Sequence, residues 1–255
     1  AMHNTPGDVG SYGLLYQWGR KDPFPAAPTL TGTTATVGAP IYDGDNNEIK
    51  ITNSSQSSTA DNNLAFAIAN PTVCLSNYAQ FNTSRDWLQA DMSNDALWGN
   101  PKGAERNETN DFLNKGAKSF YDPCPVGWRV PPADVFRNFT ASGGYAWVID
   151  DFDIADISGD GAKSLADYDY GWTFNLSDSA SSYFPAAARF DGSYAMLMGS
   201  MSGLWGSYWG NAPYPGDMFQ GGAYSVLSFQ IKDTAGNEMI TTSPAGGGAR
   251  ADAYS

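Results

Sequence analysis

Short runs of apolar and aromatic residues, separated by glycine-rich and polar segments, characterise the second half of the chain. Runs of this length and composition, bounded by turn-forming residues, are typical of β-strands. We expect strands at residues 171–176, 182–190, 195–198, 207–209 and 223–231. An acidic stretch at residues 150–169 interrupts this pattern before the strands begin.

The first half of the chain has a less regular pattern. An apolar, aromatic run at residues 12–18 ends at Gly19, and short β-like pieces follow at residues 35–37 and 48–52. The apolar spacing at residues 60–70 fits either a short helix or a strand, whereas residues 133–139 fit a short amphipathic helix and residues 145–149 are β-like. The fold class predicted is therefore one mixed α+β domain with a strand-rich C-terminal half and long irregular loops.

Composition and charge narrow the function classes. A hydrophobic content of 42% with 14% aromatics indicates a folded protein with a sizeable core. The formal net charge of −13 argues against nucleic acid and against an anionic membrane surface, because both require a basic footprint. The chain contains no apolar run near the roughly 18 residues that a membrane-spanning helix needs.

The segment at residues 121–132, YDPCPVGWRVPP, is the most informative part of the sequence. Proline fixes φ and removes a backbone donor, so this segment is neither helix interior nor central strand. We expect a rigid, cross-linked corner from which the short helix at residues 133–139 departs.

This segment also supports a resemblance to a known family. Together with YGLLYQWGRKDPFP at residues 12–25 and AIANPT at residues 67–72, it resembles the Fibrobacter succinogenes major paralogous domain of gut Bacteroidetes surface proteins. Later pieces fit in the same order: FPAA at residues 184–187, GSYW at residues 206–209 and AYS at residues 253–255. The resemblance covers nearly the whole chain from about Gly10 onward.

The resemblance implies a C-type lectin-like fold, with the two ends of the domain close together and long irregular loops on one face. The opening residues AMHN are typical of a cloning remnant, so we expect residues 1–9 to be a remnant and leader and residues 10–255 to be a single domain. Members of the family usually close with a Ser-Val-Arg-Cys-Val phrase, which would begin where this chain stops at Ser255. The domain would then be exported and displayed on the surface of a Gram-negative gut bacterium, as part of a lipoprotein or pilus-tip adhesin.

Two cysteines, Cys74 and Cys124, leave three arrangements open. The resemblance implies that Cys124 pairs with a cysteine beyond Ser255. A Cys74–Cys124 bridge is the second arrangement, and free thiols in this chain are the third.

The sequence contains few of the residue combinations that enzymes use for catalysis. The only histidine is His3, so neither a Ser-His nor a Cys-His nucleophilic pair can be assembled, and zinc sites that combine His with Cys fail on count. Phosphate-binding and dinucleotide-binding glycine motifs do not occur. The chain is therefore interpreted as non-enzymatic, and a glycan-active enzyme using paired carboxylates is the weakest of the alternatives.

An acidic loop at residues 156–167 has the twelve-position spacing of a calcium loop, with Gly161 at the tight sixth place. Oxygen-bearing side chains occupy the first, third, fifth, ninth and twelfth places: Asp156, Ser158, Asp160, Ser164 and Asp167. Against calcium, Lys163 occupies the eighth place, where such loops carry an aliphatic residue. Bound Ca²⁺ and a solvated acidic insertion both remain open here.

Aromatic residues supply the candidate ligand site. Trp18, Trp98, Trp128 and Trp209 lie in family-like phrases and are predicted to be structural. The segment at residues 194–218 instead interleaves aromatic and polar residues with glycine and proline, which is typical of binding loops. The candidate ligand-binding residues are Tyr194, Trp205, Tyr208, Asn211, Tyr214 and Asp217, of which Trp205 and Tyr214 are expected to be the most exposed. The alternative is a small core beneath long loops.

The sequence as a whole predicts a cell-surface adhesion module that recognises a glycan or a host or partner protein through these aromatic-rich loops. The main alternative is a structural pilus-tip or assembly subunit whose contacts are other pilus subunits.

Overall fold

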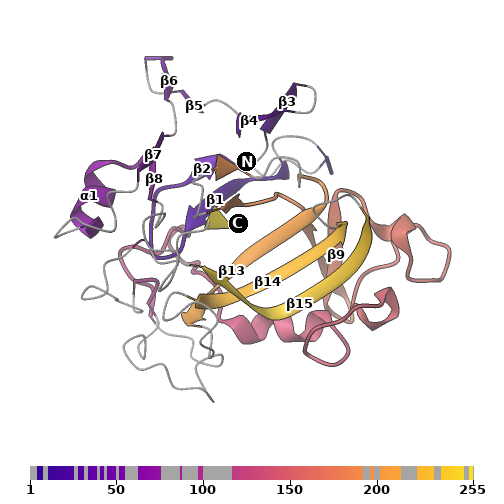
Figure 1. Ribbon diagram of the computed structural model, residues 1–255. Helices are drawn as coiled ribbons and strands as arrows, with labels where there is room; N and C mark the ends of the chain where they lie inside the picture. Colours follow the sequence, from indigo (N-terminus) through magenta and orange to yellow (C-terminus); the bar gives the residue numbers. More distant parts are fainter. Residues whose placement is uncertain are drawn as a thin grey trace.

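A computed structural model of the chain describes residues 5–7, 11–25, 28–31, 34–38, 41–42, 45–49, 52–54, 63–75, 87, 97–99, 117–191, 196–197, 202–213, 223–232, 237–249 and 253–254. Strands dominate this part of the molecule, in small and mostly antiparallel sheets with few helical turns (Figure 1). The predicted strand-rich C-terminal half is thereby confirmed.

The elements of the first half are short. The strands are β1 (Leu14–Gln17), β2 (Phe24–Pro25), β3 (Pro28–Thr31), β4 (Thr34–Gly38), β5 (Ile41–Tyr42), β6 (Glu48–Ile49), β7 (Thr52–Ser54) and β8 (Val73–Leu75). Helix α1 (Asn63–Ala69) decides the ambiguous segment at residues 60–70 in favour of a helix.

The second half begins with three 3₁₀ helices, η5 (Ala133–Phe139), η6 (Ile149–Asp151) and η7 (Leu165–Asp167). The strands that follow are β9 (Gly171–Ser177), β10 (Ala180–Pro185), β11 (Phe190–Asp191), β12 (Met196–Leu197), β13 (Trp205–Pro213), β14 (Ala223–Lys232), β15 (Glu238–Ala249) and β16 (Ala253–Tyr254). Each predicted strand of this half therefore overlaps an observed one, whereas residues 145–149 contribute only an isolated bridge and the start of η6.

The two ends of the described chain meet in one sheet. Its strand order is β12-β11-β16-β1-β2, and β1 pairs antiparallel with β16 through Tyr16 opposite Tyr254 and Gln17 opposite Ala253. Figure 1 shows β1 and β16 side by side near the middle of the molecule. This pairing joins parts of the sequence more than two hundred residues apart.

The longest strands form a separate sheet of order β13-β14-β15, and the β9–β10 hairpin stands beside it. Within this sheet Gly206 lies opposite Phe229, and a Cβ atom at Gly206 would come within 2.3 Å of the Phe229 ring. The glycine therefore makes room for the ring to lie across the neighbouring strand, where it supplies the packing that glycine lacks.

Two hydrophobic clusters fill the interior. The first lies under β1 and α1 and contains Trp18, Ala67, Leu75, Trp87, Leu97, Trp98, Val130 and Trp209. The second lies between η5 and the long strands and contains Phe136, Phe139, Ala146, Phe152, Ile154, Trp172, Phe174, Ala186, Leu227 and Phe229. Of the tryptophans predicted to be structural, Trp18, Trp98 and Trp209 are buried as expected.

Indole groups tie β1 and the turn after it to the rest of the first cluster. Three alternate carbonyls along this segment each accept an indole N–H: Tyr16 from Trp209 at 2.6 Å, Trp18 from Trp87 at 2.9 Å and Arg20 from Trp98 at 3.2 Å. The Trp18 indole in turn donates to the Gly210 carbonyl on β13 at 3.1 Å. These bonds satisfy backbone groups that burial would otherwise leave without a partner.

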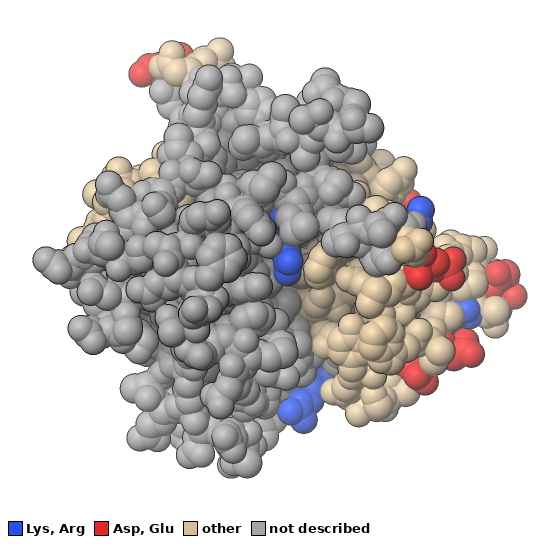
Figure 2. Space-filling view, in the orientation of Figure 1, with Lys and Arg blue, Asp and Glu red and all other residues tan. Residues whose placement is uncertain are grey.

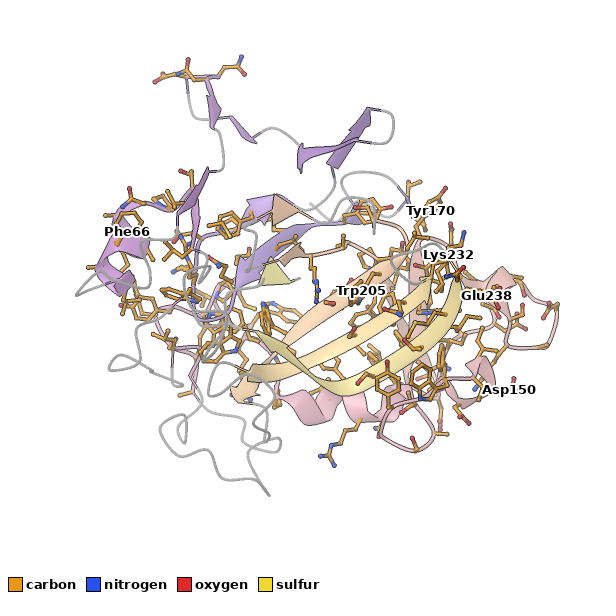
Figure 3. The ribbon with its side chains drawn as sticks, in the orientation of Figure 1. Phe66, Asp150, Tyr170, Trp205, Lys232 and Glu238 are labelled. Atoms are coloured by element: carbon orange, nitrogen blue, oxygen red, sulfur yellow. The ribbon has the colours of Figure 1, made fainter. Side chains whose placement is uncertain are left out.

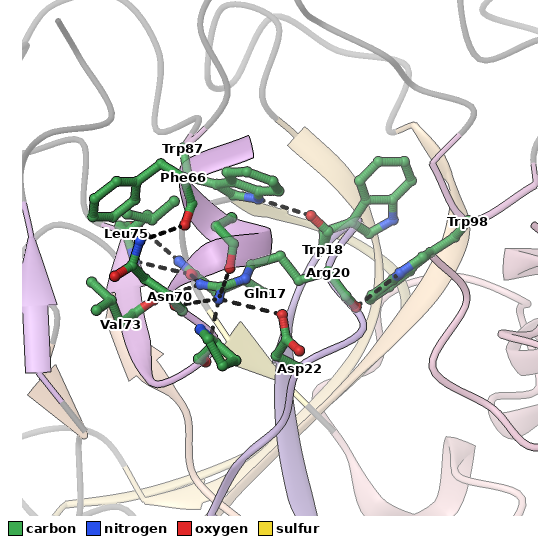
Figure 4. Close-up of polar contacts among 12 residues, drawn as sticks. Gln17, Trp18, Arg20, Asp22, Phe66, Asn70, Val73, Leu75, Trp87 and Trp98 are labelled. Atoms are coloured by element: carbon green, nitrogen blue, oxygen red, sulfur yellow. Dashed lines mark hydrogen bonds and ion pairs between the residues drawn. The ribbon is translucent and has the colours of Figure 1, made fainter. Parts of the chain in front are cut away.

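Arg20 is 2% exposed and organises the end of α1 (Figure 4). Its guanidinium donates to the carbonyls of Ala67, Asn70, Pro71 and Val73, and an ion pair joins it to Asp22 at 3.6 Å. Helix α1 carries no basic residue in its own last turn, so Arg20 supplies from a distant segment the positive charge that favours a helix C-terminus.

We predict that Arg20→Met lowers the free energy of unfolding by about 3 kcal/mol, because several buried carbonyls lose a charged donor at once. Urea denaturation should show a lower transition midpoint with an unchanged slope. Lys232→Met, at an exposed position, should change stability by less than about 0.5 kcal/mol. Equal stability of the Arg20 variant and the wild type would contradict this account of the helix end.

Candidate functional site

Trp205 opens β13 and is the best-defined member of the predicted ligand site (Figure 3). Its indole is half-buried, its N–H donates to the Ser228 hydroxyl at 3.1 Å, and its ring carries the Arg189 guanidinium 4.5 Å from the ring centroid. The indole is therefore fixed on a strand, with a cation stacked on one face.

Sequence reasoning missed Arg189. It follows the run of alanines at residues 186–188, and Ala188 adopts a left-handed φ of 62° while its N–H donates to the Trp205 carbonyl at 2.8 Å. This backbone geometry places the next residue beside the indole. Nothing in the spacing of the alanine run indicates such a turn, so the pair could not be predicted from the sequence.

Two other predicted ligand residues lie inside the fold. Tyr208 packs against the second hydrophobic cluster and donates its hydroxyl to the Pro185 carbonyl, and burial raises the pKa of Tyr208 well above its ordinary value. Asn211 is 1% exposed, and its backbone N–H donates to the Pro131 carbonyl at 2.9 Å. Burial of this kind is typical of framework side chains, and the role of Tyr208 and Asn211 in ligand binding stays a prediction.

The remaining predicted ligand residues, Tyr194, Tyr214 and Asp217, lie outside the described residues. Their place in the site follows from the sequence alone: Tyr214 comes directly after the last residue of β13.

The predicted calcium loop folds onto its own carboxylates. One oxygen of Asp156 accepts the Gly159 N–H at 2.6 Å and the Ser158 hydroxyl at 3.1 Å, and the other accepts the Gly161 N–H at 2.9 Å. These backbone hydrogen bonds, from Gly161 first and then Gly159, lower the pKa of Asp156. Asp160 accepts the Ala162 N–H at 2.9 Å in the same manner.

The second end of the loop is held by Asp167, which is 1% exposed. Its two oxygens accept the N–H groups of Ser158 and Ser164, each at 3.0 Å, and Ser164 and Asp167 form a capping box at the start of η7. Burial opposes ionisation of Asp167, but the hydrogen bonds it accepts outweigh that effect and lower its pKa.

The loop side chains are thus ordered by backbone donors. Among the described residues, no three His, Cys, Asp or Glu side chains gather into a group that could hold a metal ion. The five predicted calcium ligands occupy one continuous loop, in which Ser158 contacts both Asp156 and Asp167. Calcium binding by this loop stays a prediction.

The proline-rich corner is clamped by Asp122, which is 1% exposed. One oxygen of Asp122 accepts the Lys118 ammonium at 2.7 Å and the Cys124 N–H at 2.9 Å, and the other accepts the Val130 N–H at 3.0 Å. Both Cys74 and Cys124 are thiols. The corner is therefore held together by hydrogen bonds to the Asp122 carboxylate, and no Cys74–Cys124 disulfide is formed.

Trp128 corrects a further expectation, because its side chain is 73% exposed instead of structural. The backbone N–H of Trp128 donates to the Pro125 carbonyl at 3.0 Å, and this turn leaves the indole in solvent. A second exposed indole, Trp147, was not predicted at all: it is 61% exposed and lies beside Tyr145, which is 52% exposed. Sequence reasoning interpreted residues 145–149 only as β-like, and an alternating pattern of this kind does not say which face meets solvent.

Comparisons with a set of protein-family models, with curated proteins and with solved structures gave no match. The resemblance drawn from the sequence motifs therefore stays a prediction. No helix in the described part of the chain is long and apolar enough to cross a membrane.

The Cys124 thiol should be unreactive in the folded protein. Burial first, and then the Asp122 carboxylate, raise the pKa of Cys124 to about 11, so its thiolate at neutral pH is depleted about a hundredfold relative to an ordinary cysteine. We expect slow alkylation by iodoacetamide at pH 7.5 and a rate that rises as the pH approaches 11. Because the folded-state pKa is the higher one, the contribution of Cys124 to stability should be lost as the pH rises from about 9 to 11.

Peptide mapping by mass spectrometry separates Cys124 from Cys74, and unfolding in guanidinium gives the reference rate. Alkylation of folded Cys124 at the reference rate would contradict the assigned environment. So would an intact mass two hydrogens below that of the dithiol form.

Proposed function

We propose that the protein is a non-enzymatic binding module, exported and displayed on the bacterial cell surface, that recognises a glycan or a partner protein. The finer fold proposed is C-type lectin-like. The pairing of β1 with β16 and the separate β13-β14-β15 sheet support it, because such a domain brings its two ends together beneath a second sheet that carries long loops.

The observation that carries the proposal is the fixed Trp205–Arg189 pair at the start of β13. An indole held by a strand and a hydrogen bond loses little conformational entropy when a ligand covers it. The stacked guanidinium adds a positive charge beside the ring, and an indole paired with a cation suits the ring face and hydroxyl groups of a sugar or the carboxylates of a protein. Tyr214 and Asp217 follow along the chain and are proposed to complete the site.

The ligand is best found by screening the full chain on glycan and protein arrays, with and without Ca²⁺. Trp205→Ala combined with Tyr214→Ala should abolish binding to the ligand found, while the protein stays folded. Because Trp205 also donates to Ser228, we expect the double variant to lose about 1–2 kcal/mol of stability. Trp128→Ala, which removes an exposed indole elsewhere, should leave affinity unchanged.

Wild-type affinity in the double variant would refute the proposed site. Complete unfolding of the double variant would instead assign both rings to the core. Tyr214→Ala alone, measured by circular dichroism and by binding, distinguishes loss of binding from loss of folding. Silent arrays together with capture of a pilus subunit would favour the structural role.

We further propose that the loop at residues 156–167 binds Ca²⁺, because Asp156 and Asp160 retain lone pairs beside the hydrogen bonds they accept. Titration of chelator-treated protein with CaCl₂ should release heat and raise the melting temperature, since a ligand bound to the folded state stabilises it. Asp156→Asn with Asp160→Asn should remove both effects, and Asp178→Asn in the exposed β9–β10 turn should not. Absence of heat together with an unchanged melting temperature would rule out calcium binding by this loop.

A further inference from the structure

A closed loop at residues 141–151 projects from the second hydrophobic cluster. Its two ends meet where Thr140 and Phe152 form an antiparallel bridge and the Ala141 N–H donates to the Asp151 carbonyl at 2.7 Å. Phe152 is fully buried, so the base of the loop is fixed in the core.

The middle of this loop is attached to the long sheet. Ala146 and Thr242 on β15 exchange backbone hydrogen bonds of 2.9 and 3.0 Å, and both residues are buried. Side chains alternate along an extended backbone, so burial of Ala146 turns both of its neighbours outward. The loop therefore holds the side chains of Tyr145 and Trp147 in fixed positions at the surface.

These two rings form one exposed aromatic pair. Their centroids are 4.9 Å apart with a 41° angle between the ring planes, and the adjacent Val148 is 55% exposed. We name Tyr145, Trp147 and Val148 the aromatic knob. Because the two rings contact each other, their relative orientation is fixed. An exposed aromatic pair of fixed shape suits binding in a pocket of a partner protein.

The charge around the knob has one dominant sign. Asp150 and Asp151 follow it directly and are exposed, and residues 150–169 contain seven aspartates and one lysine. That lysine, Lys163, donates to the carbonyls of Asp150 and Phe152 and so lies against the base of the loop. Arg137 on η5 is the other exposed cation in the neighbouring sequence. Figure 2 shows acidic side chains gathered at this end of the molecule.

We propose that the aromatic knob is a docking surface for a protein segment that carries arginine or lysine side chains. A guanidinium or ammonium group is attracted to the faces of exposed Trp and Tyr rings, and the neighbouring carboxylates balance its charge. Trp and Tyr are also the residues that most often dominate protein interfaces. Charge favours this occupant: the Coulomb attraction of the aspartates acts on a cation and not on a neutral glycan, and an anionic partner is repelled.

This surface is separate from the site proposed at Trp205. The knob lies on the loop at residues 141–151, which is attached to β15, whereas Trp205 is the first residue of β13, so either proposal can fail without the other.

The test uses the full chain and a labelled peptide of alternating glycine and arginine with five arginines, followed by fluorescence anisotropy. The wild type should bind this peptide, and binding should weaken as salt is raised from about 50 to 500 mM. Tyr145→Ala with Trp147→Ala should weaken binding about tenfold with an unchanged melting temperature, because both rings are exposed. Asp150→Asn with Asp151→Asn should weaken binding and reduce its salt dependence.

Matched controls separate the knob from general acidity. Trp128→Ala and Asp178→Asn, each at an exposed position elsewhere, should bind within about twofold of the wild type. The proposal is overturned by absence of peptide binding, by equal affinity in the Tyr145/Trp147 variant, or by equal binding of a peptide with glutamate in place of arginine. It is also overturned if neutral oligosaccharides bind through the knob and the arginine peptide does not.

Discussion

The structure depends on how the backbone of residues 16–20 is satisfied inside the first hydrophobic cluster. Strand β1 pairs with β16 on one side and with β2 on the other, and each pairing covers only two residue pairs. Many of the backbone N–H and carbonyl groups of this segment must therefore find side-chain partners. Indole N–H groups meet it at Tyr16, Trp18 and Arg20, and each donor comes from a different part of the chain. Packing and hydrogen bonding therefore act through the same three tryptophans, and loss of any one exposes a polar group to an apolar surrounding.

The same principle extends to the two polar side chains of this segment. The Gln17 amide makes a two-point contact with the backbone of Leu75, donating at 2.8 Å and accepting at 3.0 Å, much as a neighbouring strand would. The Arg20 guanidinium then donates to backbone carbonyls at the C-terminal end of α1 and in the turn after it. A buried charge is tolerated here because many acceptors surround it and Asp22 pairs with it. Side chains thus substitute for a regular sheet, which explains how such short strands can form a defined core.

The sequence predicted those features that depend on local pattern. Alternation and turn residues located β9 and β14, and the proline-rich corner was recognised at its correct place. β15 was missed because Gly246, Gly247 and Gly248 carry no strand signal, and this segment is a strand only because β14 pairs with it. Trp128 was misjudged and the exposure of Trp147 was not predicted for a related reason: composition shows that an indole is present, but only tertiary contacts decide whether it is buried. Arg20 and Arg189 depend on long-range neighbours and so gave no local signal.

The tryptophans differ in burial and in the partner of the indole N–H, and this difference links the fold to the proposed functions. Trp18, Trp87, Trp98 and Trp209 are buried, and each donates to a backbone carbonyl. Trp172 is also fully buried, but its indole N–H has no hydrogen-bond partner in the structure. Trp205 is intermediate: its N–H is bonded within the sheet while its ring supports a cation. Trp147 is mostly exposed although its loop is closed at the base and attached in the middle. A large apolar ring held rigidly in water costs free energy that the fold itself does not recover, and contact with another molecule recovers it.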